Sequence, residues 1–83
     1  MISMSIEQQV LEEEYTLMLE LLTERSSASS FDVEDIEQEY NYLLVYQGQD
    51  WGGRGEIKNA EIQGHIWAYE VFLKRWRENN PKD

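Results

Sequence analysis

The sequence predicts a small all-α domain of three helices, arranged as a three-helix bundle or as a helical hairpin with one further helix. Three segments carry apolar residues at the 3.6-residue spacing of a helix, and none sustains the alternation of a strand. Two polar interruptions, residues 26–30 and 48–55, separate these segments, and the second holds four glycines in eight residues. The predicted helices cover residues 5–24, 33–47 and 56–77.

The length and composition predict a single domain over residues 1–83. The chain contains no cysteine, so neither a disulfide nor a thiolate metal site can stabilise it. Residues 78–83 are polar and include Pro81, and we expect them to form a frayed tail. No apolar run approaches the roughly 18 residues that cross a bilayer, and no basic segment of a secretory signal is present. We therefore expect a cytoplasmic protein.

The first helix begins at Ser5, whose hydroxyl is placed to accept a hydrogen bond from the amide of Gln8. Its apolar residues fall on two adjacent stripes, which together cover about half of the circumference. We therefore expect this helix to contact two neighbours. Glu14 lies between the stripes, and we expect it to pair with Arg75 or reach solvent, with a ligand-binding acid as the alternative. The first stripe is Ile6, Val10, Leu17 and Leu21, and the second is Leu11, Tyr15, Met18 and Leu22.

The second helix carries the clearest start signal in the chain. Asp32 is a favourable N-cap, and Phe31 and Ile36 occupy the two positions of a hydrophobic staple. Gly48 is placed to cap the C-terminus. The helix has a narrow apolar stripe, which consists of Val33, Ile36, Tyr40, Leu43 and Leu44.

The third helix is apolar over most of its circumference, which predicts that it is central in the fold or covered by a second chain. Ala60, Gly64 and Ala68 recur every four residues and would let another helix approach closely. With Trp67 they form the predicted seam, either within the core or between two copies of the chain. Because two short helices leave part of such a surface uncovered, we expect a homodimer.

One residue pair on the third helix has catalytic or metal-binding potential. His65 is the only histidine, and Glu61 precedes it by one helical turn. Such a pair could orient an imidazole as a general base or supply two metal ligands. The interpretation we favour places His65 at the edge of the core beside Phe72, with a hydrogen bond to Glu61. No second histidine completes a site, so we predict no metal and no cofactor.

The glycine-rich segment before the third helix has two interpretations. Residues 52–55, Gly-Gly-Arg-Gly, are similar to an anion-binding loop at a helix N-terminus. However, the Lys-Ser/Thr ending of a P-loop is missing, and Glu56 would oppose a phosphate. We therefore favour an interhelical turn that is held in place by Trp51.

The strongest functional signal is the distribution of charge. Twelve of the seventeen acidic residues lie in the first fifty positions, where Arg25 is the only cation, so this part carries a formal charge of −11. The remaining residues carry +1, for a total of −10. Such a field repels nucleic acids and acidic membranes and attracts basic surfaces. Two tyrosines stand among the carboxylates, a mixture typical of binding hot spots. The predicted partner-binding residues are Glu12, Glu13, Glu34, Glu37, Glu39, Tyr42 and Tyr46.

We therefore expect a non-enzymatic protein–protein interaction module whose acidic face imitates nucleic acid and binds a basic, nucleic-acid-binding surface of a partner. In size and acidity the chain is similar to the small inhibitors of phages and mobile elements, a likeness of composition without a motif. The alternative is a structural or assembly subunit that oligomerises through the third helix. The third hypothesis is a helical enzyme or metal-binding protein that uses His65 and Glu61. Salt-sensitive binding would favour the first hypothesis and a salt-insensitive oligomer the second.

Overall fold

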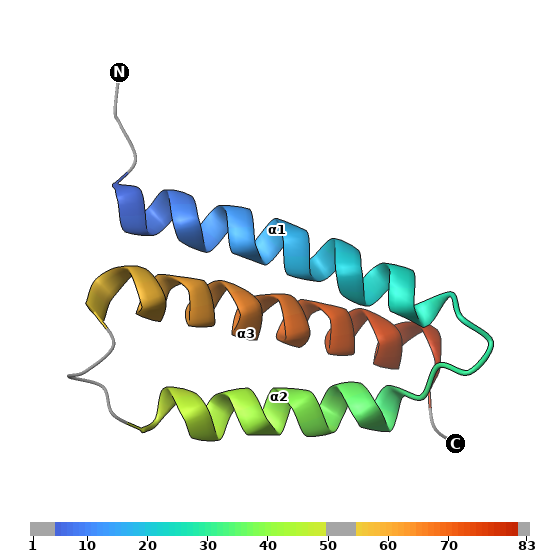
Figure 1. The fold of residues 1–83 in the computed structure, drawn as a ribbon. Helices are drawn as coiled ribbons and strands as arrows, with labels where there is room; N and C mark the ends of the chain where they lie inside the picture. The colour runs from blue at the N-terminus through green and yellow to red at the C-terminus, as the bar shows by residue number, and fades with distance from the viewer. Residues whose placement is uncertain (1–4, 50–54, 82–83) are drawn as a thin grey trace.

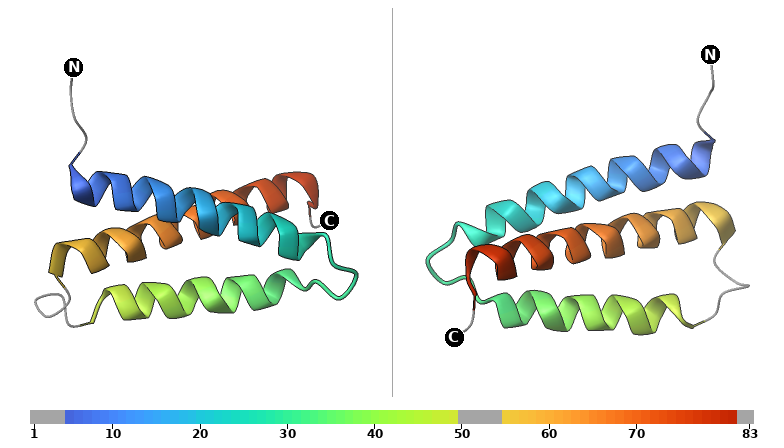
Figure 2. Two further views of the ribbon diagram at one scale, coloured as in Figure 1. Left: turned by 45° about the horizontal axis from the view of Figure 1, so that its top comes forward. Right: turned by 180° about the vertical axis from the view of Figure 1, so that it is seen from behind.

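The computed structural model describes residues 5–49 and 55–81, and these residues have the predicted all-α architecture (Figure 1). The helices are α1 (Ile6–Ser26), α2 (Val33–Gln47) and α3 (Gly55–Asn79). Helix α3 lies between α1 and α2 when the molecule is seen from the front and from behind (Figures 1 and 2). It packs extensively against α1 and less extensively against α2. The central position that the sequence predicted for the third helix is therefore confirmed.

The helix starts follow the predicted caps. The hydroxyl of Ser5 accepts a hydrogen bond from the amide of Gln8 at 3.1 Å. The carboxylate of Asp32 accepts one from the amide of Glu34 at 2.9 Å. Each bond satisfies an amide that has no partner within its own helix, which fixes where the helix begins.

The helix ends differ in detail from the prediction. Helix α3 continues through Asn79, and the amide of Asn80 still donates to the carbonyl oxygen of Trp76 at 2.8 Å, so the polar tail begins later than expected. Gly48 is the C-cap of α2, but its φ of −75° lies in the right-handed helical region. The left-handed freedom of glycine is therefore not used at this cap. The positive φ of 80° belongs to Gly55, at the start of α3.

The core is built mainly on α3. Leu22 of α1 and Ile36 of α2 are fully buried against it, and Leu73 completes the centre. An aromatic group closes one end, where the ring of Phe31 lies 6.0 Å from Phe72 and 5.0 Å from Trp76, measured between centroids. The buried apolar residues of α3 are Ala60, Ile62, Ile66, Ala68, Tyr69, Phe72 and Leu73.

The contact between α1 and α3 is close because small residues line it. Ala60, Gly64 and Ala68 are all buried. A Cβ atom on Gly64 would lie 2.5 Å from the carbonyl oxygen of Leu11, so α1 occupies the space that any other side chain would need. Trp67 lies outside this contact with 45% of its surface exposed. The small residues thus form a seam within the chain, and Trp67 borders it.

Helix α1 has two neighbours, as expected, but the two contacts differ in extent: α1 packs closely on α3 and reaches α2 through Arg25. Its second apolar stripe faces α3, and α1 has no extensive contact with α2. The first stripe is left largely uncovered: Ile6 is 67% exposed and Leu17 is 60% exposed. The close approach at Gly64 holds α1 against α3 with its second stripe inward.

Candidate functional site

A groove runs between α1 and α2, with α3 as its floor. It exists because both outer helices pack on α3 without packing extensively on each other. Met18, Leu43 and Tyr69 give it an apolar lining, and Tyr42 stands on the α2 side. We call it the interhelical groove; its lining residues are Met18, Gln38, Glu39, Tyr42, Leu43, His65 and Tyr69.

A three-residue network ties the helices together at this groove. The guanidinium of Arg25 donates two hydrogen bonds to the carboxylate of Glu39, at 2.8 and 2.9 Å. The hydroxyl of Tyr69 donates to the same carboxylate at 2.8 Å. One residue comes from each helix, so the network fixes α1, α2 and α3 relative to one another. A bidentate Arg–carboxylate pair is the strongest form of such a link.

The network also shifts the ionisation of its members. The hydrogen bond from Arg25 lowers the pKa of the Glu39 carboxyl group below its ordinary value. Burial, together with the adjacent carboxylate of Glu39, raises the pKa of Tyr69 to about 12. The carboxylate of Glu39 in turn raises the pKa of Arg25. At neutral pH the network therefore consists of a cation, an anion and a neutral phenol.

Two of the predicted partner-binding carboxylates are thus engaged within the fold. Glu39 belongs to the network, and Glu37 pairs with Arg77 at 3.3 Å. The sequence analysis missed both links because each joins residues from different helices. An excess of acid in α2 gives no indication of which carboxylates meet a cation elsewhere in the chain.

His65 and Glu14 pair with each other, which neither prediction for these residues anticipated. Nε2 of His65 lies 2.9 Å from Oε1 of Glu14, and both side chains are half-buried. The expected bond from His65 to Glu61 is wrong, since Glu61 instead accepts from Lys58 at 3.4 Å. The one available signal in the sequence was the line of small residues, because Gly64 directly precedes His65. In the structure, a Cβ atom placed on Gly64 would lie 3.3 Å from the Cβ atom of Glu14.

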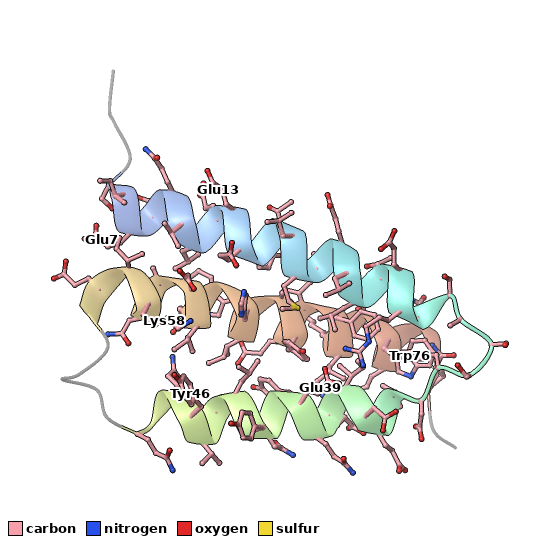
Figure 3. The ribbon with its side chains drawn as sticks, in the orientation of Figure 1. Glu7, Glu13, Glu39, Tyr46, Lys58 and Trp76 are labelled. Carbon is pink, nitrogen blue, oxygen red and sulfur yellow. The ribbon has the colours of Figure 1, made fainter. Side chains whose placement is uncertain are left out.

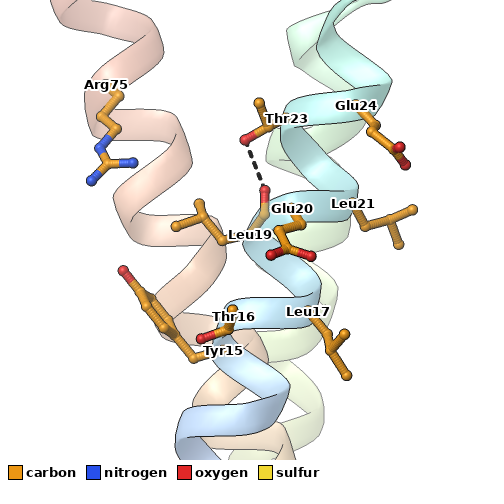
Figure 4. A pocket seen from close by; sticks show the side chains of 9 residues that line it. All are labelled: Tyr15, Thr16, Leu17, Leu19, Glu20, Leu21, Thr23, Glu24 and Arg75. Carbon is orange, nitrogen blue, oxygen red and sulfur yellow. Dashed lines mark hydrogen bonds between the residues drawn. The ribbon is translucent and has the colours of Figure 1, made fainter.

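The expected pairing of Glu14 with Arg75 is also wrong. Figure 4 shows Arg75 on the same side of α1 as Tyr15, across a hollow from Thr23. In the same view Leu17 and Leu21 project from the opposite side of α1. Glu14 lies on the flank of α1 that faces His65, so Arg75 cannot serve as its partner.

The outer surfaces of α1 and α2 carry exposed carboxylates. Figure 3 shows Glu13 projecting away from the bundle on the outer side of α1. Among the described residues, none of the acids in this set forms an ion pair. The sequence analysis named only part of the set. We call them the outer carboxylates: Glu12, Glu13, Glu20, Glu24, Glu34 and Asp35.

Tyr42 and Tyr46 form an aromatic pair on α2. Their rings are stacked, with centroids 6.5 Å apart and planes at 17°. Tyr42 is 70% exposed and lines the interhelical groove, while Tyr46 is more covered. The stacking holds a large, partly apolar surface in a defined orientation, which lowers the entropy cost of using it for binding.

Two carboxyl groups, those of Glu7 and Glu56, lie close together at the N-termini of α1 and α3. Glu7 and Glu56 interact directly, and the hydrogen bond and charge of Glu7 raise the pKa of Glu56. A backbone hydrogen bond lowers the pKa of Glu7. Within residues 5–49 and 55–81, no group of three potential ligands could hold a metal ion. The pair reflects the crowding of acids in this chain.

Comparisons with protein-family models, with curated proteins and with solved structures found no match for this chain. In the described part of the chain, each helix is too short or too polar to cross a membrane. Residues 51–54 lie outside the described residues, so the favoured interhelical turn held by Trp51 and the alternative anion-binding loop over residues 52–55 both stay predictions. The function must therefore be argued from the groove and the charge around it.

Proposed function

We propose that this protein is a non-enzymatic interaction module whose acidic outer surface binds a basic, nucleic-acid-binding surface of a partner protein. One observation carries the proposal: the outer carboxylates lie exposed on α1 and α2, whereas Arg25, the cation of these two helices, is engaged by Glu39. The outward field of these helices is therefore negative. Such a field attracts a cationic partner and raises the association rate.

The exposed aromatic surface of Tyr42 and Tyr46 can lengthen the lifetime of a complex, which the surface charges alone cannot do. Exposed carboxylates steer an encounter, but each rim charge contributes little to the lifetime of a complex. Tyr42 offers a large surface that a partner can desolvate, and Tyr46 supports it from behind by stacking. In this mechanism the carboxylates take the place of phosphates on the partner, and Tyr42 slows dissociation. The cysteine-free sequence is compatible with the cytoplasm, where we place this interaction.

The alternative functions have weaker support. Oligomerisation through α3 would need an apolar surface on that helix, but most of its apolar residues are covered by α1 and α2. The expected homodimer stays a prediction. Catalysis through His65 would use an imidazole that is already hydrogen-bonded to Glu14, in a groove where Glu39 and Tyr69 bond to each other.

The proposal is tested by affinity capture with two baits. The first is the intact chain, and the second is a variant in which the outer carboxylates are replaced by their amides. Proteins retained by the intact chain alone are identified, purified and measured for binding between 50 and 500 mM salt, a range over which screening of surface charges increases strongly. We expect basic, nucleic-acid-binding proteins whose affinity falls steeply with salt and which duplex DNA displaces.

Two results would remove the proposal. The first is that the amide bait retains the same proteins as the intact chain, or that a retained partner binds equally well at about 50 and about 500 mM salt. The second is a partner whose captured surface is neutral or acidic. The amide variant is expected to fold, because exposed carboxylates without ion pairs contribute little to stability.

A further inference from the structure

Most of the first apolar stripe of α1 is exposed in the described chain. Its residues, Ile6, Val10, Leu17 and Leu21, lie on one side of the helix, and Leu21 is 47% exposed in addition to the two residues named above. A surface helix normally buries its continuous apolar stripe. Leaving three large aliphatic side chains exposed along one side of the helix has a free-energy cost that a binding partner would remove.

This stripe borders the interhelical groove. Leu21 lies three residues after Met18 and four before Arg25, so all three share one flank of α1. Met18 lines the groove, and Arg25 reaches across it to Glu39 on α2. The stripe and the groove therefore form one continuous surface, with Tyr42 on its far side.

The shape of this surface suits a helix. The two helices that flank the interhelical groove, α1 and α2, run roughly antiparallel (Figure 1), and residues of α3 form the floor of the groove. A fourth helix can lie along such a groove with its side chains at i, i+3, i+4 and i+7 pointing down. The apolar residues it would meet are Leu17, Leu21 and Met18 on α1, with Leu43 and Tyr42 on α2.

The charge at the rim selects the chemistry of that helix. Glu13 and Glu20 lie within one turn of Leu17, and Glu24 lies within one turn of Leu21. On the α2 side, Asp35 is exposed one turn before Gln38 of the groove. A second copy of this chain would place its own acidic helices against these carboxylates, because it carries a net charge of −10. A helix flanked by lysine and arginine meets opposite charge along both edges.

We infer that the surface between α1 and α2 binds a cationic amphipathic helix of the partner, whose apolar side chains insert between Leu17, Leu21 and Tyr42. This inference rests on the proposed function and adds the mode of binding: the basic surface that the module recognises is a helix rather than a flat or extended surface. The partner helix would complete a four-helix arrangement.

The test uses three synthetic peptides of about 18 residues, five helical turns. The first places leucine at i, i+3, i+4 and i+7 with lysine on both flanks. The second has the same composition in an order that destroys the apolar stripe, and the third keeps the stripe but carries glutamate in place of lysine. Binding to the full chain is measured by fluorescence anisotropy at low salt, and backbone amide shifts in NMR spectra locate the contact.

We expect the first peptide to bind at least about tenfold more tightly than the second, a difference of about 1.4 kcal/mol, and the third not to bind. The backbone amide shifts that the first peptide causes in the NMR spectrum should centre on Met18, Tyr42 and Leu43. Replacing Tyr42 by Ala, or Leu17 and Leu21 together by Ser, should weaken the binding of the first peptide about tenfold. Trp67→Ala is the matched control, because Trp67 is also a large exposed side chain but lies beside Tyr15 and Glu12 on the other flank of α1.

The outcomes separate this inference from the proposed function. If the two lysine peptides bind equally, or if the Tyr42 and leucine variants bind like Trp67→Ala, the helix-binding mode is overturned while the acidic module survives. If neither lysine peptide binds at low salt, the proposed function fails with it. The substituted side chains are exposed, so the variants should remain folded; their melting curves and the peptide comparison on the unmodified chain guard against a folding artefact.

Discussion

The two helices that pack on α3 do so by different means. Helix α1 meets α3 backbone against backbone, since the absent side chain of Gly64 makes room for the carbonyl oxygen of Leu11. Helix α2 buries Ile36 in the core and adds long polar side chains at the contact with α3: Tyr40 bonds to Glu70 at 2.8 Å, and Gln47 bonds to Gln63 at 2.9 Å. The first contact depends on the size of one residue. The second is spread over apolar packing and several hydrogen bonds.

This difference bears on where the molecule tolerates change. A close backbone contact cannot adjust to an added atom without moving a whole helix. A contact made through side-chain hydrogen bonds loses one bond at a time, each worth about 0.5–1.5 kcal/mol. The α1 contact should therefore be the more brittle of the two, and the α2 contact the more graded.

The largest expected effect is that of Gly64→Leu. A Cβ alone would lie 2.5 Å from the Leu11 carbonyl oxygen, so a leucine must push α1 away. We expect the free energy of unfolding to fall by about 3 kcal/mol, as measured by urea denaturation. Gly64→Ala should also destabilise, although the better helix propensity of alanine, about 1 kcal/mol, offsets part of the strain.

Gly48→Ala is the matched control for this substitution. Its φ is −75° and a Cβ would make ordinary contacts of 3.6 Å, so alanine fits without strain. We expect no loss, or a gain of about 0.4–1 kcal/mol from the less flexible unfolded chain. If both glycine variants melt alike, the contact between α1 and α3 is not the brittle one.

Glu39→Gln should have the next largest effect. The amide keeps the shape of the side chain but loses the negative charge. That charge holds Arg25 and strengthens the hydrogen bond that the carboxylate accepts from Tyr69. We expect a loss of about 1–2 kcal/mol, less than a fully buried pair would give because both charged groups are partly exposed. Glu13→Gln removes an exposed acid from α1 and should change the free energy of unfolding by less than about 0.5 kcal/mol. Equal effects would mean that the network does not hold the helices.

The stability of the protein should also fall at high pH through Tyr69. Its pKa is raised from 10.0 to about 12, so the unfolded state loses this proton more readily than the folded state does. The stabilisation is present below pH 10 and is lost as the pH rises to about 12. As the pH rises from 10 to about 12, the natural chain should therefore lose stability relative to Tyr69→Phe. The free energies of unfolding of the two proteins, measured across this interval, test this. A difference that is constant with pH would contradict the raised pKa of Tyr69, which burial and the adjacent carboxylate of Glu39 cause.

The smallest effect is expected for the pair of His65 and Glu14. A double-mutant cycle with Glu14→Ala and His65→Ala should give a coupling of about 0.5–1 kcal/mol, because the pair is half-buried. The matched cycle combines Glu61→Ala with His65→Ala, because Glu61 is the partner of His65 that sequence spacing favours. It should give a coupling near zero, since Glu61 bonds to Lys58. A coupling between Glu61 and His65, with none between Glu14 and His65, would instead support the pair of His65 and Glu61 that the sequence predicted.

The sequence by itself determined the three helices, the caps at Ser5 and Asp32, and the central place of α3. These features depend on short-range patterns: the spacing of apolar residues, the chemistry of a few terminal side chains, and the breaks between segments. The small-residue line through Gly64 also follows from spacing alone. It predicted a close helix contact, although not which helix would make it.

Only the tertiary structure decided which side chains meet across helices. Whether Glu14 reaches His65 or Arg75, and whether Glu39 faces solvent or Arg25, depends on how far each helix is rotated and shifted along its neighbour. A rotation of one residue, about 100°, exchanges one partner for another. The first stripe of α1 illustrates the same limit: its apolar period is plain in the sequence, but its exposure follows from the close approach at Gly64, which turns the other stripe toward α3.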